Sequence, residues 1–287
     1  MAIRWYAWSP IQARPAPMIP RRFKARFQGF SRLDLLAVLA TAALLVLVAT
    51  AMASTHRVTP EVILCQENLR RLGIAWRSHG AENPLLARNP SGSSASTENP
   101  VTSDAWALGW IDWTTAPDNT NYTKIQIPAF LPYIGTDIGL YRCPTDRFVS
   151  TAQRSRGWQN RTRSYVMNGL VNLSTTDILP GGFTRFRTLS DFSSPSSTFV
   201  FTEEHPDSIN DPAFLADPSG RSFYDLPASF HEGAATFAFA DGHVEVHRWL
   251  NSRLRQPIRF GAFTLVTVPA NDPDLRWLSE RASQPLR

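Results

Sequence analysis

The side chains with the most obvious chemistry lie in the distal half of the chain. His243, Glu245 and His247 alternate along one segment, so a strand there would place them on one face, about 7 Å apart. Such a set resembles a zinc site, but its spacing differs from the established helical motifs and no third histidine is placed beside it. We therefore favour solvent-facing strand residues. His231 is expected to be a polar anchor at the mouth of the same hairpin, near Asp241 or a loop carbonyl.

An oxygen-rich segment, residues 203–211, is a better candidate for an ion. Ca²⁺ takes about six to eight oxygen ligands, and this loop could offer several. The candidate ligands are Glu204, Asp207, Asn210 and Asp211. The loop does not match the EF-hand spacing. The alternative is an acidic surface loop in which Asp and Asn side chains cap turns without an ion.

Nucleophilic and phosphate chemistry have little support in this sequence. The chain contains no Gly-x-Ser-x-Gly elbow and no glycine-rich phosphate loop. We predict a non-enzymatic protein with no catalytic residues. The alternative, from another class, is a membrane-anchored extracytoplasmic domain that binds or hydrolyses a ligand with the region of His231, Asp207 and Asp241.

The length of the chain fits one domain plus an anchor. Within that domain, a helix and a β-rich body are expected to position these residues. An amphipathic helix is predicted over residues 61–79, after a kink or restart at Pro60. Its apolar stripe consists of Cys65, Leu69, Leu72 and Trp76. Residues 82–104 are polar and rich in turn formers, which indicates a surface loop.

The rest of the body is predicted to consist of short strands. β-branched and aromatic residues favour strands at 122–127, 197–202 and 260–268. Asp241-Gly242 is a two-residue turn signal within 234–249. With those two residues as the loop, Phe239 pairs with Val244, one hairpin face is apolar and the other is polar. A helix covering an antiparallel sheet is an α+β arrangement.

The N-terminal segment is strongly basic and then apolar. Its first 29 residues carry six Lys or Arg and no acid, so +6 of charge there leaves −1 for residues 30–287 of a chain whose net charge is +5. The pI near 9.6 therefore comes from the basic leader, whose charge follows the positive-inside rule. No nucleic-acid partner is expected. The uncharged run at 35–54 reaches the ~20 residues that cross a bilayer. A lone Asp34 at its edge is costly, which predicts a functional role.

Two simpler interpretations of this run stay open. A secretory signal peptide would be cleaved after a small-x-small site, which residues 51–53 match loosely. A plain signal anchor requires only the basic flank and the apolar span.

The junction Gly29-Phe30, the acid Asp34 five residues beyond the glycine and the apolar run together resemble a type IV prepilin signal. The resemblance implies that a prepilin peptidase cuts after Gly29 and that Phe30 becomes the methylated N-terminus. It also implies that Asp34 serves assembly. The family usually has glutamate where this chain has Asp34, but aspartate keeps the charge and can still pair with a neighbouring terminal ammonium.

The distal half carries a second resemblance. His231, nine intervening residues and then Asp241-Gly242 resemble the C-terminal motif of a large bacterial family of prepilin-like proteins. Other family-like pieces occur in order at residues 65–73, 141–146, 164–168, 204–211 and 227–231. The resemblance covers residues 29 to about 249 and implies a filament subunit more firmly than any chemistry.

That resemblance implies a pilin-like α+β fold. Its long N-terminal helix, membrane-spanning in the first half, would pack on an antiparallel β-sheet with extended loops. The expected domains are a basic leader (1–29), a transmembrane and filament-core helix (30–54), an amphipathic continuation (55–80) and an extracytoplasmic β-rich body (81–287). Major pseudopilins of type II secretion are similar in using a calcium-stabilised loop.

The implied function is a pseudopilin of a type II secretion or type IV pilus-like filament, and the bulky body favours a minor subunit. The expected partners are other pilin subunits, prepilin peptidase, the inner-membrane assembly platform and the lipid bilayer. The N-terminus would be cytoplasmic and the body periplasmic. A secretion pseudopilus, an adhesive pilus and an uptake filament all stay open.

Both cysteines, Cys65 and Cys143, fall in the family-like pieces. An even pair in an oxidising compartment favours a disulfide. The bridge would close a loop of 79 residues, for which the chain-entropy model gives at most roughly 4–5 kcal/mol. The alternative is two buried free thiols that pack as small apolar groups.

Overall fold

A computed structural model of the chain describes residues 31–54, 59–174, 180–261, 263 and 265–286. The chain divides into two compact units, Met1–Arg57 and Val58–Arg287. The first contains α1 (Arg32–Ser54). The described elements of the second are, in chain order, α2 (Pro60–Glu82), α3 (Ser93–Thr97), η1 (Pro117–Asn119), η2 (Tyr122–Lys124), α4 (Leu131–Ile134), η3 (Ile138–Tyr141), α5 (Thr151–Ser155), β1 (Tyr165–Asn168), η4 (Leu189–Asp191), η5 (Pro195–Ser197), β2 (Phe199–Glu203), β3 (Ala213–Phe214), β4 (Ala234–Phe239), β5 (Val244–Arg248), η6 (Ser252–Leu254) and α6 (Pro273–Ala282).

The predicted long N-terminal helix is wrong. Helices α1 and α2 belong to separate units, and residues 55–58 between them lie outside the described part of the chain. Helix α2 starts afresh because Thr59 is extended and Pro60, which lacks an N–H and has a fixed φ, suits the first helical position. The amphipathic helix itself is confirmed, since Cys65, Leu69, Leu72 and Trp76 are all buried.

The predicted membrane span is also corrected. No helix within the described residues has both the length and the apolar character needed to cross a bilayer. The apolar run predicted at 35–54 is no longer than the ~20 residues that a membrane span requires. The transmembrane helix, the pilin-like fold class built on it and the single-pass inner-membrane location with a periplasmic body are therefore wrong predictions.

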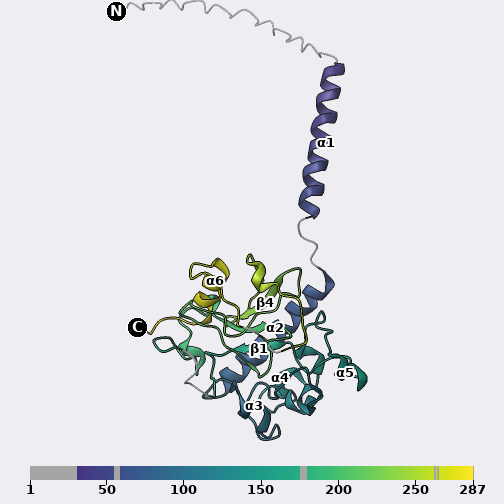
Figure 1. Cartoon of the computed structure of the whole chain (residues 1–287). Helices are drawn as coiled ribbons and strands as arrows, with labels where there is room; N and C mark the ends of the chain where they lie inside the picture. The colour runs from purple at the N-terminus through teal and green to yellow at the C-terminus, as the bar shows by residue number, and fades with distance from the viewer. Residues whose placement is uncertain (1–30, 55–58, 175–179, 262, 264, 287) are drawn as a thin grey trace, which may run out of the picture. The chain divides into compact units, whose positions relative to one another are not determined.

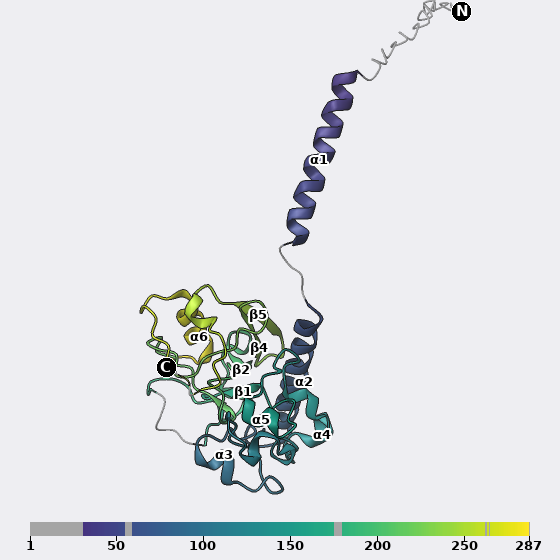
Figure 2. The ribbon, with the colours of Figure 1, turned by 45° about the vertical axis from the view of Figure 1, so that its right-hand side comes forward.

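The sheet is mixed, whereas an antiparallel sheet was predicted. Its strand order is β3-β1-β2-β4-β5, and Figure 2 shows β1, β2, β4 and β5 side by side. Neighbouring strands are antiparallel except for β3, which runs parallel to β1. The chain leaving β2 crosses back to the far side of β1, where the Pro212 carbonyl accepts a hydrogen bond from Met167 N at 2.8 Å. Sequence alone did not indicate this crossover.

Helices α2 and α6 pack on opposite faces of the sheet. On the α2 side, Cys65 Sγ lies 2.7 Å from the Glu203 carboxylate of β2. On the α6 side, the rings of Trp277 and Phe237 are 4.9 Å apart. Phe237 pairs with Thr202, the neighbour of Glu203, so Phe237 and Glu203 point to opposite faces. Strand β4 is buried along its whole length because both of its faces are covered.

The β4–β5 hairpin forms where predicted, but its register differs by one residue. Ala238 pairs with Val244, and Phe239 N donates to the His243 carbonyl at 2.9 Å. The connection therefore has three residues, ending at Gly242 with φ +100°. A turn followed by a left-handed glycine is the usual three-residue hairpin loop. The one-residue shift changes which side chains lie opposite each other across the two strands. The ring of Phe239 consequently stacks on the ring of His243, with their centroids 4.3 Å apart.

The remaining strand predictions had mixed outcomes. Residues 197–202 overlap β2, as predicted. Residues 122–127 contain the 3-10 helix η2 instead, because the Asn121 side chain caps it by accepting from Thr123 N. Among the described residues of 260–268, pairing consists of one isolated bridge, between Val266 and Phe223. The loop at 82–104 also contributes to the core through Leu86, Ala87 and Ala95.

Candidate functional site

Four side chains from distant parts of the sequence meet inside the second unit, and they are called here the Cys-Glu-His cluster. Its members are Cys65 of α2, Cys143 after η3, Glu203 at the end of β2 and His231 before β4. One potential ligand atom from each residue lies within 4.8 Å of the other three. Exposure is 0% for both cysteines and Glu203 and 6% for His231. The cluster is therefore closed to solvent.

Cys65 and Glu203 are positioned by the packing of α2 on the sheet. Cys65 lies on the buried stripe of α2, and Glu203 pairs with Tyr165 across β1 and β2. The sulfur of Cys65 is 2.7 Å from Glu203 Oε1 and 3.0 Å from the Tyr165 hydroxyl. Glu203 Oε2 accepts a hydrogen bond from Thr236 N at 2.7 Å. One carboxylate oxygen is thus anchored to β4, and the other points into the cluster.

Cys143 and His231 are positioned by turns. Cys143 N donates to Ser164 Oγ at 3.2 Å, and the Cys143 carbonyl accepts from Asp146 N in the Cys-Pro-Thr-Asp turn. His231 is followed by Gly233, whose φ of +85° favours glycine. His231 Nε2 lies 2.9 Å from Glu203 Oε1 and 3.6 Å from Cys143 Sγ. The two turns therefore place Cys143 Sγ and His231 Nε2 beside the Glu203 carboxylate.

The charges of the cluster without a bound ion follow from burial and pairing. Burial, assisted by Cys143 and Glu203, raises the pKa of the Cys65 thiol. Burial opposes charge on His231, but its hydrogen bonds to Cys143 and Glu203 outweigh burial and raise its pKa to about 10. Burial likewise disfavours ionised Glu203, but pairing with His231 prevails and lowers its pKa. The cluster thus contains a buried imidazolium–carboxylate pair beside the neutral Cys65 thiol.

The predicted disulfide is not formed in the structure, where Cys65 and Cys143 are both free and buried. The prediction that α2 and the Cys143 turn approach each other is consistent with the cluster, because both sulfurs belong to it. The two thiols contact each other, and each sulfur also has another partner in the cluster, Glu203 Oε1 for Cys65 and His231 Nε2 for Cys143. Sequence patterns indicated the pair of thiols but not the acid and the imidazole that lie beside them.

The proposed calcium ligands do not converge. Glu204 accepts from Ser208 Oγ, whereas Asp207 accepts from Trp113 Nε1 and from Arg259 N. Asp211 accepts from Gly92 N and Ala213 N, and Asn210 Oδ1 accepts from Asp211 N. In the described part of the chain, the Cys-Glu-His cluster is the one place where three or more His, Cys, Asp or Glu ligand atoms meet. The bonds match the turn-capping part of the alternative but not its surface loop, because Glu204 and Asp211 are buried.

The residues of the predicted histidine-rich strand have separate partners. His243 bonds to Asp241 at 2.6 Å and to Glu245 at 3.2 Å, at the end of the hairpin. His247 lies 3.3 Å from Asp274 of α6 and stacks on Trp277. His231 does not anchor the hairpin through Asp241 as predicted, because its ring bonds to Glu203. His231, Asp207 and Asp241 therefore serve three different local networks and do not form the binding or hydrolytic site of the alternative hypothesis.

Asp34 caps the first turn of α1. Asp34 Oδ2 accepts from Ser31 N at 2.9 Å and from Ser31 Oγ at 2.8 Å, and Asp34 N donates back to Ser31 Oγ at 3.1 Å. These reciprocal bonds form a capping box, and they hold the pKa of Asp34 below its usual value. The predicted processing residues, Gly29 and Phe30, lie outside the described residues.

Glu203 is the member of the candidate site that the sequence did not indicate, because its neighbour Glu204 was selected as an ion ligand. An acid at the end of the short apolar strand β2 was the available signal. Thiol, imidazole and carboxylate groups are ligands that Zn²⁺ accepts, so this cluster could hold a metal ion.

Comparison with protein-family models, with curated proteins and with solved structures finds no match.

Proposed function

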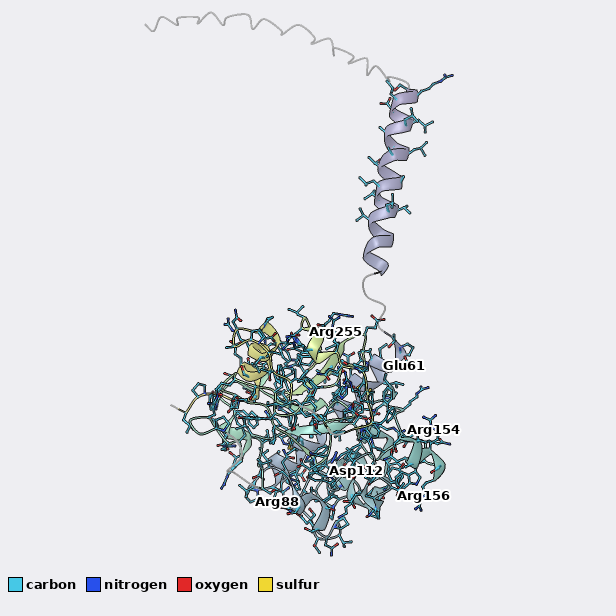
Figure 3. The ribbon with its side chains drawn as sticks, in the orientation of Figure 1. Glu61, Arg88, Asp112, Arg154, Arg156 and Arg255 are labelled. Carbon is cyan, nitrogen blue, oxygen red and sulfur yellow. The ribbon has the colours of Figure 1, made fainter. Side chains whose placement is uncertain are left out.

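We propose that the chain is a structural, non-enzymatic subunit of a filament of the type IV pilus or type II secretion pseudopilus class. The observation that carries this proposal is the apolar surface of α1. Its large apolar side chains are exposed in the isolated chain, from 46% for Val48 to 77% for Leu33. Figure 3 shows side chains projecting from both sides of the α1 ribbon. A helix that is apolar all round requires a covering partner.

We take that partner to be α1 of neighbouring subunits. Among the described residues, the apolar core cluster runs from Cys65 to Ala282 and contains no residue of α1. Apolar residues on all sides allow one helix to contact several others, as in an assembly built from head-to-tail interfaces. The prepilin-like junction before α1 supports the same class of assembly, with cleavage after Gly29 by a prepilin peptidase and methylation of Phe30.

Asp34 has a specific place in this proposal. Cleavage after Gly29 would place a free amine at Phe30, four residues before the Asp34 carboxylate. That carboxylate is fixed by Ser31 at the start of α1. In a bundle of α1 helices it would pair with the Phe30 amine of an adjacent subunit, because a charge among apolar helices requires an opposite charge.

Co-assembly of two differently tagged copies tests the proposal. Leu39 and Leu44 are 57% and 62% exposed on α1, and Ile74 is 54% exposed on α2. The double variant Leu39→Lys/Leu44→Lys should leave the sedimenting filament fraction, because each Lys would be buried without a partner in the bundle. Ile74→Lys is the matched control and should assemble normally. Wild-type levels of assembly by the double variant would contradict the proposal.

A further inference from the structure

We propose that the Cys-Glu-His cluster is a structural zinc site, in which Cys65, Cys143, Glu203 and His231 bind one Zn²⁺ tetrahedrally. The site lies wholly within the second unit. The zinc site therefore does not depend on assembly through α1, and its test is independent of the test of the proposed function.

The geometry fits a four-coordinate ion. Tetrahedral zinc with bonds of about 2.0–2.3 Å places its ligand atoms roughly 3.3–3.8 Å apart. All four ligand atoms of the cluster lie within 4.8 Å of one another, and Cys143 Sγ and His231 Nε2 are 3.6 Å apart. Glu203 Oε1 is closer to Cys65 Sγ, at 2.7 Å, and to His231 Nε2, at 2.9 Å. An ion at the centre requires these two separations to widen by less than 1 Å.

The chemistry of the donors points to zinc. Two sulfurs are soft ligands and the imidazole nitrogen is borderline, so the single carboxylate oxygen is the one ligand of the four that suits Ca²⁺ or Mg²⁺, and the set disfavours both ions. On binding, the two thiols and the imidazolium release their protons to solvent. Two thiolates, one carboxylate and a neutral imidazole around Zn²⁺ leave a single negative charge. This arrangement neutralises most of the charge that burial would otherwise make costly.

Neighbouring groups already orient the ligands from outside the cluster. Thr236 N holds Glu203 Oε2 at 2.7 Å, which leaves Oε1 directed inward. The Tyr165 hydroxyl lies 3.0 Å from Cys65 Sγ and can donate to a thiolate there. Ser164 Oγ, which donates to Asp146 at 2.7 Å, accepts from Cys143 N. Hydrogen bonds of this kind fix ligand orientation in established metal sites.

A disulfide explains less of the arrangement. It would join Cys65 and Cys143 but would leave the convergence of Glu203 and His231 on the same sulfurs without a role. Zinc uses all four residues and ties together α2, the turn after η3, the end of β2 and the entry to β4. With four protein ligands and no exposed face, the site has no open coordination position, which is the arrangement of structural zinc.

Metal loading of the full-length chain tests this proposal. The purified, reduced protein is stripped with chelator, incubated with Zn²⁺ and separated from free metal by gel filtration. We expect one retained zinc per chain. X-ray absorption at the zinc edge should show two sulfur neighbours at about 2.3 Å and two nitrogen or oxygen neighbours at about 2.0–2.1 Å. Cobalt substitution should give the strong visible bands of a tetrahedral site with thiolate-to-cobalt charge transfer.

Variants locate the ion. Cys143→Ser and His231→Gln should lose stoichiometric zinc, and Glu203→Gln should weaken binding at least tenfold. Glu204→Gln is the matched control, since Glu204 is an adjacent buried acid that faces Ser208 rather than the cluster. It should retain one zinc with an unchanged cobalt spectrum. Removing the metal from the wild type should lower its melting temperature.

The wild-type measurements alone can overturn the proposal, so it does not depend on every variant folding. It is contradicted if the reduced protein retains no zinc, or if bound zinc has no sulfur neighbours. It is equally contradicted if the two cysteines of the freshly isolated protein form a disulfide that excludes the metal. Equal loss of zinc in Glu204→Gln and Glu203→Gln would also contradict it.

Discussion

Two adjacent acids show how strongly a single position decides the role of a side chain. Glu203 has bonds to both carboxylate oxygens, from Thr236 N and from the Cys65 and His231 side chains. Glu204 bonds to Ser208 through one oxygen, and its other oxygen is buried with no hydrogen-bond partner in the structure. Burial consequently raises the pKa of Glu204. The same residue type is an ion-pair partner at one position and a costly buried acid at the next.

This contrast predicts unequal responses of the free energy of unfolding to amide substitution at Glu203 and Glu204, measured in the presence of chelator. Glu203→Gln leaves the His231 charge without its partner and should lower the free energy of unfolding by about 3 kcal/mol. Glu204→Gln removes no ion pair and should change it by less than about 1 kcal/mol, or raise it. Urea unfolding of both variants with chelator present measures the difference. Equal destabilisation by the two substitutions would show that the Glu203–His231 ion pair makes no specific contribution to the free energy of unfolding.

Asp225 predicts a pH dependence of stability. Burial of its carboxyl group raises its pKa to about 7 from 3.8, despite the hydrogen bond from Leu215 N. Between these values the folded state binds the proton more tightly than the unfolded state, so stability falls as pH rises from about 4 to about 7. Asp225→Asn should flatten this part of the profile, with a difference on the order of 4 kcal/mol near pH 7. Denaturant melts of both proteins across this range provide the check; parallel profiles would refute it.

At the scale of elements, patterns within one segment were predictable and pairings between segments were not. The stripe of α2 follows from helical periodicity, and β2 from its β-branched and aromatic residues. The hairpin position followed from Asp241-Gly242, but its register depended on a three-residue loop that the dipeptide alone does not specify. Helix α6 was missed, although Asp272 before Pro273 is a recognisable start signal.

The same limit applies to the candidate site. Cys65, Cys143 and His231 were singled out by residue type, and both thiols were expected to meet. Glu203 joins them only because the β1–β2 register and the packing of α2 bring it there. Such tertiary positions are not encoded in local spacing.

The hairpin loop provides a prediction at this scale. Gly242 has φ +100°, where a side chain is strained, whereas Gly181 has an ordinary φ and open space around it. Gly242→Ala should therefore destabilise the protein by about 1 kcal/mol or more, while Gly181→Ala should be neutral or slightly stabilising. Thermal unfolding of the two variants compares them directly. A neutral Gly242→Ala would mean that the loop can adopt another turn.

At the scale of the whole molecule, the chain combines a body with its own apolar core and an apolar helix, α1, that we propose neighbouring subunits cover. Asp34 is the charged group on which that division can be tested, because it caps α1 and is also proposed to pair between subunits. Asp34→Glu should assemble, since it retains both the charge and the capping box. Asp34→Ala should fail.

Asp34→Asn separates the two roles of this residue. An amide still accepts a hydrogen bond at the start of a helix, as an N-terminal cap does, but carries no charge. If pairing with the Phe30 amine drives assembly, Asp34→Asn should be depleted from filaments as strongly as Asp34→Ala, at least tenfold in a sedimentation assay. Normal assembly of Asp34→Asn would leave Asp34 with the capping role alone.

The N-terminus of the assembled protein tests the central claim most directly. Mass spectrometry of the chain recovered from the sedimenting fraction of its native host should find a protein that begins at N-methylated Phe30. That result would connect the Gly29-Phe30 junction, the cap at Asp34 and the exposed apolar helix α1 in one assembly process. A chain that begins at Met1, or one cleaved within or after α1, would contradict the account of this protein as a processed filament subunit.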